Sequence, residues 1–81
     1  MAKDLKYGNV ILEYGDVGVD EPVFIFRAQD KLTPEVLRHY LGICATQGSP
    51  PRHLRNIIDN IVVIETWQKD NFTKIPESKE H

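Results

Sequence analysis

The segment from Val23 to Pro34 constrains the fold most, because strand-forming residues give way to a helix start within it. Val23 to Phe26 are β-branched or aromatic without interruption, which favours a short, substantially buried strand over a helix of four residues. Thr33 offers a hydroxyl that can accept from free amides of a first helical turn, and Pro34 suits an early helical position because it has no amide to lose. We therefore expect a strand over residues 23–27 and a helix that begins at about Pro34.

The chain before this segment is expected to supply the other strand of a hairpin. Residues 7–15 have a β-rich centre bounded by glycines, and Val10 and Tyr14 would share one face of a strand. Residues 16–22 mix glycine, acids and proline, a composition typical of a connecting loop. The sequence thus predicts a β-hairpin whose second strand is residues 23–27.

Two helices are expected after the hairpin. Apolar residues recur at helical spacing over residues 34–47 and again over residues 50–69. Between these stretches, Gly48 supplies a left-handed stop, and Ser49 with the two prolines after it supplies the cap and first turn of the second helix. Two helices joined this tightly must form an antiparallel pair.

The fold class predicted is α+β, an N-terminal β-hairpin followed by an antiparallel two-helix hairpin. It forms one small domain over residues 1–72, with a polar, flexible tail over residues 73–81. Apolar burial barely offsets chain entropy in scaffolds below roughly 70–80 residues. The single cysteine excludes an internal disulfide, and no Cys/His spacing resembles a zinc site. We expect no cofactor, and we expect oligomerisation, at least to a dimer, to complete the core.

Charge and hydropathy restrict the partners and the location. Ten Lys and Arg against twelve Asp and Glu give a formal net charge of −2, which argues against generic DNA binding. The N-terminus lacks the apolar centre of a signal peptide, and no apolar run approaches the roughly 18 residues that a membrane span needs. We expect no membrane association and a cytoplasmic location.

A first candidate ligand site lies at the crossing from strand to helix. Arg27 and Lys31 lie close to the predicted helix N-terminus, where Thr33 can satisfy the free amides only in part. An anion could bind there. The alternative is that Arg27 pairs with Glu65 or Glu35 and closes the site.

A second candidate surface is a row along the second helix, on the side away from its main apolar face. The row consists of Arg52, Asn56, Asn60, Val63 and Trp67. An apolar patch tipped with amides is not needed by a monomeric hairpin. It is either a self-association surface or a ligand platform, in which Trp67 stacks on a ring, Asn56 and Asn60 read polar edges, and Arg52 or Arg55 takes an anionic group.

Catalytic and buried charged groups are few. Cys44 with His39 or His53 is the available combination of nucleophile and base, yet Cys44 lies on the apolar stripe of the first helix, where a thiol is usually an inert core residue. We therefore expect no enzyme. Glu65 lies in the apolar stripe of the second helix and needs a partner, for which Arg27 or Arg38 is suitable.

Several short motifs over about residues 22–68 resemble those of small phage-encoded proteins of uncharacterised role. They are Phe-Ile-Phe-Arg-Ala-Gln-Asp at the end of the strand, a Pro-initiated helix, a Gly-Ser-Pro turn and a helix that ends in Trp-Gln. Such proteins often bind host components or sequester defence signals, so the resemblance implies a stoichiometric binder. The leading expectation is a non-enzymatic oligomer that binds or sequesters a small anionic ligand such as a nucleotide signal. The alternative is an adaptor or inhibitor that docks on a host protein.

Overall fold

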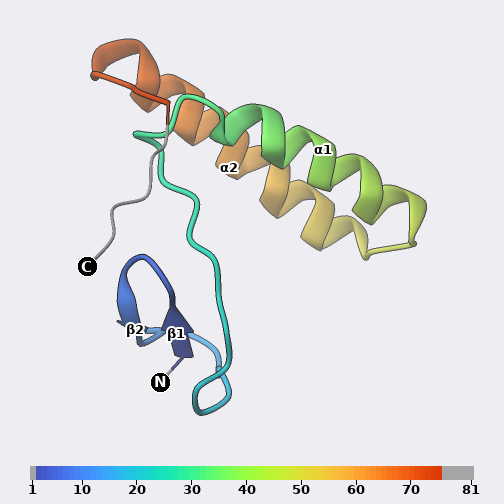
Figure 1. Cartoon of the computed structure of the whole chain (residues 1–81). Helices are drawn as coiled ribbons and strands as arrows, with labels where there is room; N and C mark the ends of the chain where they lie inside the picture. Colours follow the sequence, from blue (N-terminus) through green and yellow to red (C-terminus); the bar gives the residue numbers. More distant parts are fainter. Residues whose placement is uncertain (1, 76–81) are drawn as a thin grey trace. The chain divides into compact units, whose positions relative to one another are not determined.

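A computed structural model describes residues 2–75 of the chain. Its elements are β1 (Ala2–Asp4), β2 (Gly8–Val10), α1 (Thr33–Thr46) and α2 (Pro51–Asp70) (Figure 1). The predicted α+β order, a two-stranded antiparallel hairpin followed by two helices, is confirmed. Contacts within the described part of the chain separate an N-terminal unit, residues 2–26, from a helical unit, residues 27–75. Each unit is described by itself.

In the N-terminal unit, a buried carboxylate holds the hairpin turn. One oxygen of Asp4 accepts hydrogen bonds from the backbone N–H groups of Lys6 (2.7 Å) and Tyr7 (2.8 Å). Gly8 follows with a φ of 85°, a left-handed conformation that glycine adopts without a steric penalty. The chain then pairs back in the register Ala2 with Val10, Lys3 with Asn9 and Asp4 with Gly8.

The predicted positions of the two strands are wrong. Of residues 7–15 only Gly8–Val10 form a strand, and residues 23–27 form none. Instead, residues 21–23 run parallel to β1 on the edge that β2 does not use, with Lys3 N–H donating to Glu21 O (2.9 Å) and Val23 N–H donating to Lys3 O (3.0 Å). The local turn at Asp4 makes β1 the central strand, although its residues have little β propensity.

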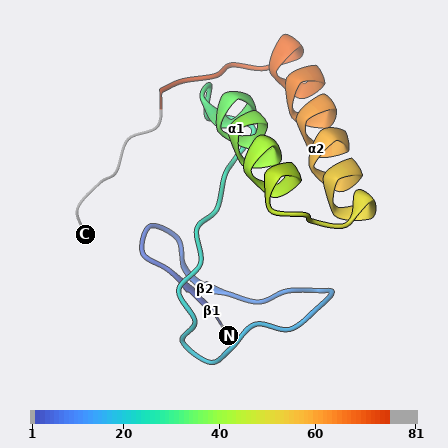
Figure 2. The same ribbon diagram turned by 90° about the vertical axis from the view of Figure 1, so that its right-hand side faces the viewer.

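In the helical unit, α1 and α2 form the predicted antiparallel pair, side by side in both views (Figures 1 and 2). Each helix lies within one residue of its predicted bounds. Gly48 has the expected left-handed backbone, with a φ of 82°, and the N–H of Ser49 closes the end of α1 on Cys44 O (3.0 Å).

Both predicted helix caps are wrong by one residue. Leu32 and Pro50 occupy the cap positions, and neither makes a side-chain capping bond. Thr33 lies inside α1 and is almost fully buried, and its hydroxyl donates to Arg27 O (2.8 Å) instead of accepting from the helix. Ser49 precedes the cap of α2. The prolines fix where each helix starts, so the capping hydroxyls are not required there.

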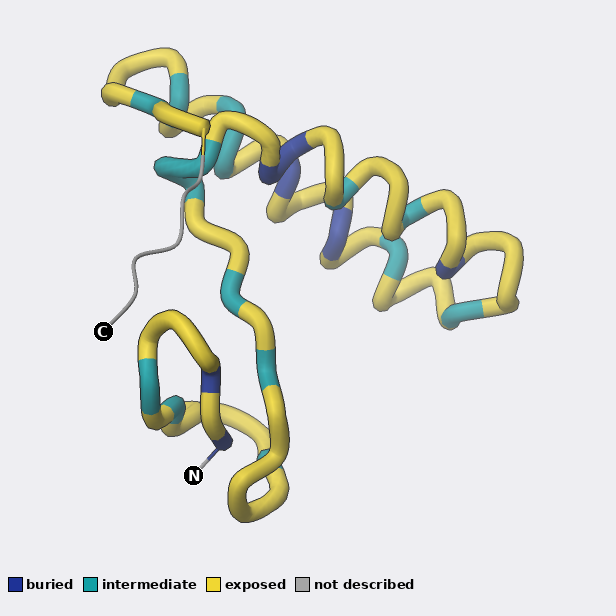
Figure 3. The backbone as a smooth tube through the Cα atoms, viewed as in Figure 1, coloured by how far each residue is buried: buried dark blue, intermediate teal, exposed yellow. Residues whose placement is uncertain are grey.

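The core of the helical unit is small (Figure 3). Cys44, Ile57 and Ile61 are buried, and three leucines pack against them, namely Leu37, Leu41 and Leu54. In the described residues neither helix is long and apolar enough to cross a membrane.

The first residues of the predicted tail are bonded to the helical unit. Lys74 pairs with the segment before α1, donating its N–H to Gln29 O (3.1 Å) and accepting from Lys31 N–H (2.8 Å). Residues 73–75 are therefore tied to the helical unit. The rest of the predicted tail, residues 76–81, lies outside the described residues.

Candidate functional site

The corner that leads into α1 is held by hydrogen bonds to its backbone carbonyls. Arg27 O accepts from Thr33 Oγ1 (2.8 Å) and from Asp30 N–H (3.0 Å), while Asp30 O accepts from Thr33 N–H (3.1 Å). Gln68, near the end of α2, donates its side-chain amide to Ala28 O (3.0 Å) and Asp30 O (3.1 Å). The corner is thereby fixed to both helices.

This arrangement weakens the case for an anion site at the corner. Arg27 and Lys31 are both exposed there, but anion binding at a helix start relies on backbone N–H groups that have no other partner. The N–H of Thr33 is already bonded inside the corner, and Pro34 has none. The two cations therefore lie at the surface beside a helix start that offers fewer open N–H groups than usual.

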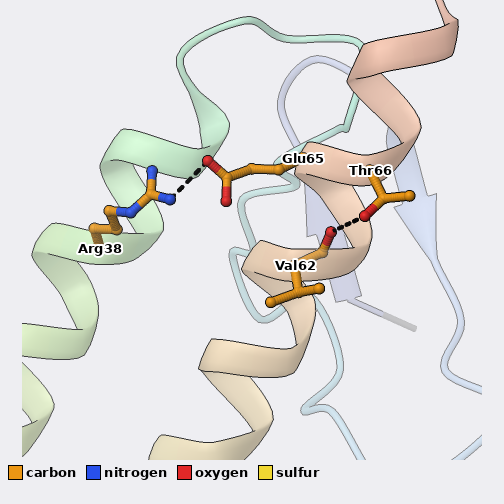
Figure 4. A network of polar contacts seen from close by, with 4 residues as sticks. All are labelled: Arg38, Val62, Glu65 and Thr66. Carbon is orange, nitrogen blue, oxygen red and sulfur yellow. Dashed lines mark hydrogen bonds and ion pairs between the residues drawn. The ribbon is translucent and has the colours of Figure 1, made fainter.

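One side of the helix pair is marked by an ion pair. Arg38 of α1 and the half-buried Glu65 of α2 lie 2.6 Å apart (Figure 4), which confirms that Glu65 pairs with an arginine and identifies it as Arg38. One turn before Glu65, Val62 lies on the same side of α2, and its carbonyl accepts from the Thr66 hydroxyl (2.8 Å). We call this the ion-pair side.

The opposite side is marked by a tyrosine. Tyr40 lies two residues after Arg38, a rotation of about 200° on a helix with 3.6 residues per turn, so it lies on the opposite side of α1. Its ring meets the ring of His53 edge-on, with centroids 6.2 Å apart, and its hydroxyl lies 3.5 Å from His53 Nε2. Because His53 belongs to α2, this contact defines a common side of both helices, the tyrosine side.

The tyrosine side also includes part of the predicted row on α2. His53, Asn60 and Trp67 are seven residues apart, which places them in one line along the helix. Val63 and Trp67 are 66% and 41% exposed. The side-chain amide of Asn60 already donates hydrogen bonds to the backbone carbonyl of Asn56 (2.8 Å) and to the side-chain oxygen of Asn56 (3.2 Å).

On α1, three exposed apolar residues extend this surface. Val36, Tyr40 and Ile43 follow one another by four and three residues and are 39%, 46% and 50% exposed. Their spacing continues the apolar stripe of residues 34–47, and the width of this stripe, greater than one neighbouring helix can cover, is the sequence signal for an exposed flank. We call the combined surface the apolar face; it consists of Val36, Tyr40, Ile43, Val63 and Trp67.

The predicted ligand residues do not gather at one place. Arg52 and Asn56 lie in the first two turns of α2, whereas Trp67 lies in its last turn, about 22 Å from Arg52 at 1.5 Å per residue. Arg27 and Lys31 belong to the corner bonded to the end of α2 by Gln68. One small ligand therefore cannot contact both ends of the row.

The thiol of Cys44 lies in the core of the helical unit, as expected, and is 7% exposed. A hydrogen bond with this thiol, then the charge of the thiolate and partial burial, raise the pKa of Tyr40 above its ordinary value of 10.0. His53 contacts Tyr40, while His39 is exposed. Among the described residues, no three or more His, Cys, Asp or Glu side chains are placed to hold a metal ion.

No protein-family model matches the chain, and comparison with curated proteins and with solved structures found no similar protein.

Proposed function

We propose that the chain is a non-enzymatic interaction protein that docks on another protein through the apolar face. The exposure of Val63 and Trp67 on α2, on the same side as Tyr40 of α1, carries this proposal. Contiguous exposed apolar patches mark interaction sites in proteins. Tyrosine and tryptophan are also the residues that contribute most often to binding energy at such sites.

The dimensions of the apolar face suit a protein partner. The 14 residues of α1 span about 21 Å, and two packed helices present a face about 20 Å wide. The product, about 420 Å², is about half of the roughly 800 Å² per partner that a standard protein interface buries, so we expect a small interface of the kind found in transient complexes. A small ligand would need a concave site instead.

The resemblance to small phage-encoded proteins suggests the kind of partner. It implies a host component, so the proposed role is that of an adaptor or inhibitor acting on a host protein in the cytoplasm. Phage origin and location are parts of the proposal, and both rest on the resemblance and on the sequence.

Binding of a small anionic ligand stays a prediction with weaker support, because Arg27 and Lys31 lie at one end of α2 and Arg52 at the other. A nucleotide panel read by thermal shift tests it. A ligand at 100 times its dissociation constant adds about 2.7 kcal/mol to the free energy of unfolding. A clear rise in melting temperature with one nucleotide would favour the ligand over a protein partner.

Two neighbouring valines of α2 provide a matched test of the docking proposal. Val63 belongs to the apolar face and Val62 to the ion-pair side, and they are 66% and 56% exposed. We expect Val63→Glu to abolish co-purification of a partner from the native host, because it places a charge in the docking surface, whereas Val62→Glu retains it. Circular dichroism should show equal helix content in both variants.

Equal loss of the partner from both variants, or retention by both, would contradict the proposal. Dissociation of a homo-oligomer by Val63→Glu, with no other protein captured by the wild type, would assign the face to self-association instead.

A further inference from the structure

In the N-terminal unit, residues 21–26 run beside β1, and every second residue of this segment is hydrogen-bonded to it. Val23 N–H donates to Lys3 O (3.0 Å), and Ile25 N–H donates to a side-chain oxygen of Asp4 (3.1 Å). In an extended chain, successive residues direct their N–H and C=O groups to opposite edges. The backbone groups of Phe24 and Phe26 therefore face away from β1.

This outward edge is open. Within residues 2–75, no hydrogen bond uses the backbone of Phe24 or Phe26. Their side chains are 78% and 46% exposed, and the two rings touch, with centroids 5.0 Å apart and planes tilted by 51°. Val23 and Ile25, by contrast, are half-buried. The segment with the strongest β propensity in the chain thus presents unpaired backbone groups and an aromatic pair on the surface.

We propose that this edge is where two copies of the chain associate, by antiparallel pairing of residues 24–26 about a two-fold axis at Ile25. In that register Phe24 lies opposite the partner's Phe26, and Phe26 lies opposite the partner's Phe24. Each of these pairs exchanges two N–H to C=O bonds, so the four outward residues use all their open backbone groups. The four phenyl rings come together on one face of the new ladder.

A second copy fits this edge because the segment is complementary to itself. Its open groups and its rings are symmetric about Ile25, and the paired residues 24–26 carry no charge, so no like charges face each other across the axis. Natural edge strands are usually protected by lysine, proline or a bulge, and here only Pro22 precedes the open residues.

The area available sets the strength of the association. Three residues per copy bury less than the roughly 800 Å² per partner of a standard interface. The same unit exposes further large apolar side chains, including Leu5 (97%) and Tyr14 (84%), which a dimer can cover. We therefore expect a dimer that forms reversibly with concentration. This inference does not depend on the proposed docking function, which uses the helical unit.

Single cysteines introduced into the full chain test the register, after Cys44→Ala has removed the natural thiol. In the proposed ladder Ile25 faces the partner's Ile25 as a non-hydrogen-bonded pair about 4.5 Å apart, which a disulfide can bridge. Phe24 and the partner's Phe24 are diagonal neighbours in this ladder, about 7–8 Å apart. A disulfide cannot bridge Cα atoms more than about 7 Å apart. The matched control is Val19→Cys, an exposed position off the edge.

We expect mild oxidation to give several-fold more disulfide-linked dimer with Ile25→Cys than with Phe24→Cys or Val19→Cys. A mixture of Phe24→Cys and Phe26→Cys chains should form the mixed disulfide in preference to either homodimer. Circular dichroism of each variant confirms that it is folded. Equal dimer yield from Val19→Cys and Ile25→Cys would overturn the inference, and so would sedimentation of the wild-type chain as a monomer from micromolar to near-millimolar concentration.

Discussion

At the scale of single residues, Asp4 organises the N-terminal unit. Burial of its carboxyl group raises the pKa, but three backbone N–H groups, from Tyr7, Lys6 and Ile25, and then the charge of Lys6, outweigh burial and lower the pKa below its ordinary value of 3.8. One side chain thus holds both the turn after β1 and the segment that carries Phe24.

Acid should weaken the hydrogen bonds that the Asp4 carboxylate accepts within the N-terminal unit. Because the folded pKa of Asp4 is below the unfolded pKa, its contribution to stability is complete above about pH 3.8 and is lost as the pH falls through the folded value. We expect the amide protons of Tyr7 and Ile25 to lose protection from hydrogen exchange together over that range, measured by NMR. Asp4→Asn keeps an oxygen for the turn amides but turns an NH₂ group toward Ile25, so only the Ile25 amide should lose its protection at neutral pH.

Asp16→Asn, at an exposed acid of the same unit, is the control and should leave both amides protected. Protection of the Ile25 amide in the Asp4→Asn variant would show that the carboxylate does not hold this segment.

At the scale of elements, the helix pair is held by its small core more than by its ion pair. Ile61 is 6% exposed and contacts Cys44 and Ile57, so Ile61→Ala should lower the free energy of unfolding by about 2–5 kcal/mol. The side chains of Arg38 and Glu65 are 54% and 40% exposed, and pairs of this kind contribute about 0–1 kcal/mol. Urea unfolding followed by helical circular dichroism gives both values. A larger loss for Arg38→Ala than for Ile61→Ala would contradict this ranking.

Among the elements, the sequence could predict those whose signals are local. The helices were predictable because their signals are local: prolines at each start, Gly48 at the turn and apolar spacing between them. The strands were not, because pairing depends on distant partners. The Asp4 carboxylate and Gly8 place Ala2–Asp4, which has weak β propensity, between β2 and residues 21–23. Val23–Phe26 has strong β propensity, yet one of its edges is unpaired.

The candidate site was predictable on one helix only. Exposed residues of α2, such as Val63 and Trp67, stand apart from its main apolar stripe, so they were recognisable from spacing. On α1, Val36 and Ile43 adjoin the stripe, and spacing alone cannot tell which flank a neighbour covers. Only the packed pair, in which each helix has a single helical neighbour, shows that this flank is exposed.

At the scale of the whole molecule, both units expose more large apolar side chains than they bury. The buried apolar residues are Ala2, Cys44, Ile57 and Ile61, whereas exposed large apolar side chains occur along the whole described chain. Small domains are marginally stable for this reason, and association with other chains is a common remedy. We therefore propose that the protein acts through two contact surfaces: the apolar face for a protein partner, and the open edge at Phe24 for a second copy.

Photo-crosslinking in the native host tests the central claim, that the apolar face docks on another protein. A photoreactive amino acid replaces either Val63, on the apolar face, or Val62, on the ion-pair side, and mass spectrometry identifies the crosslinked protein. We predict one dominant crosslinked partner from position 63 and little or none from position 62, because the two side chains point in directions about 100° apart around α2 and only Val63 belongs to the apolar face. Crosslinks of equal yield from both positions, or crosslinks from position 62 alone, would contradict the claim.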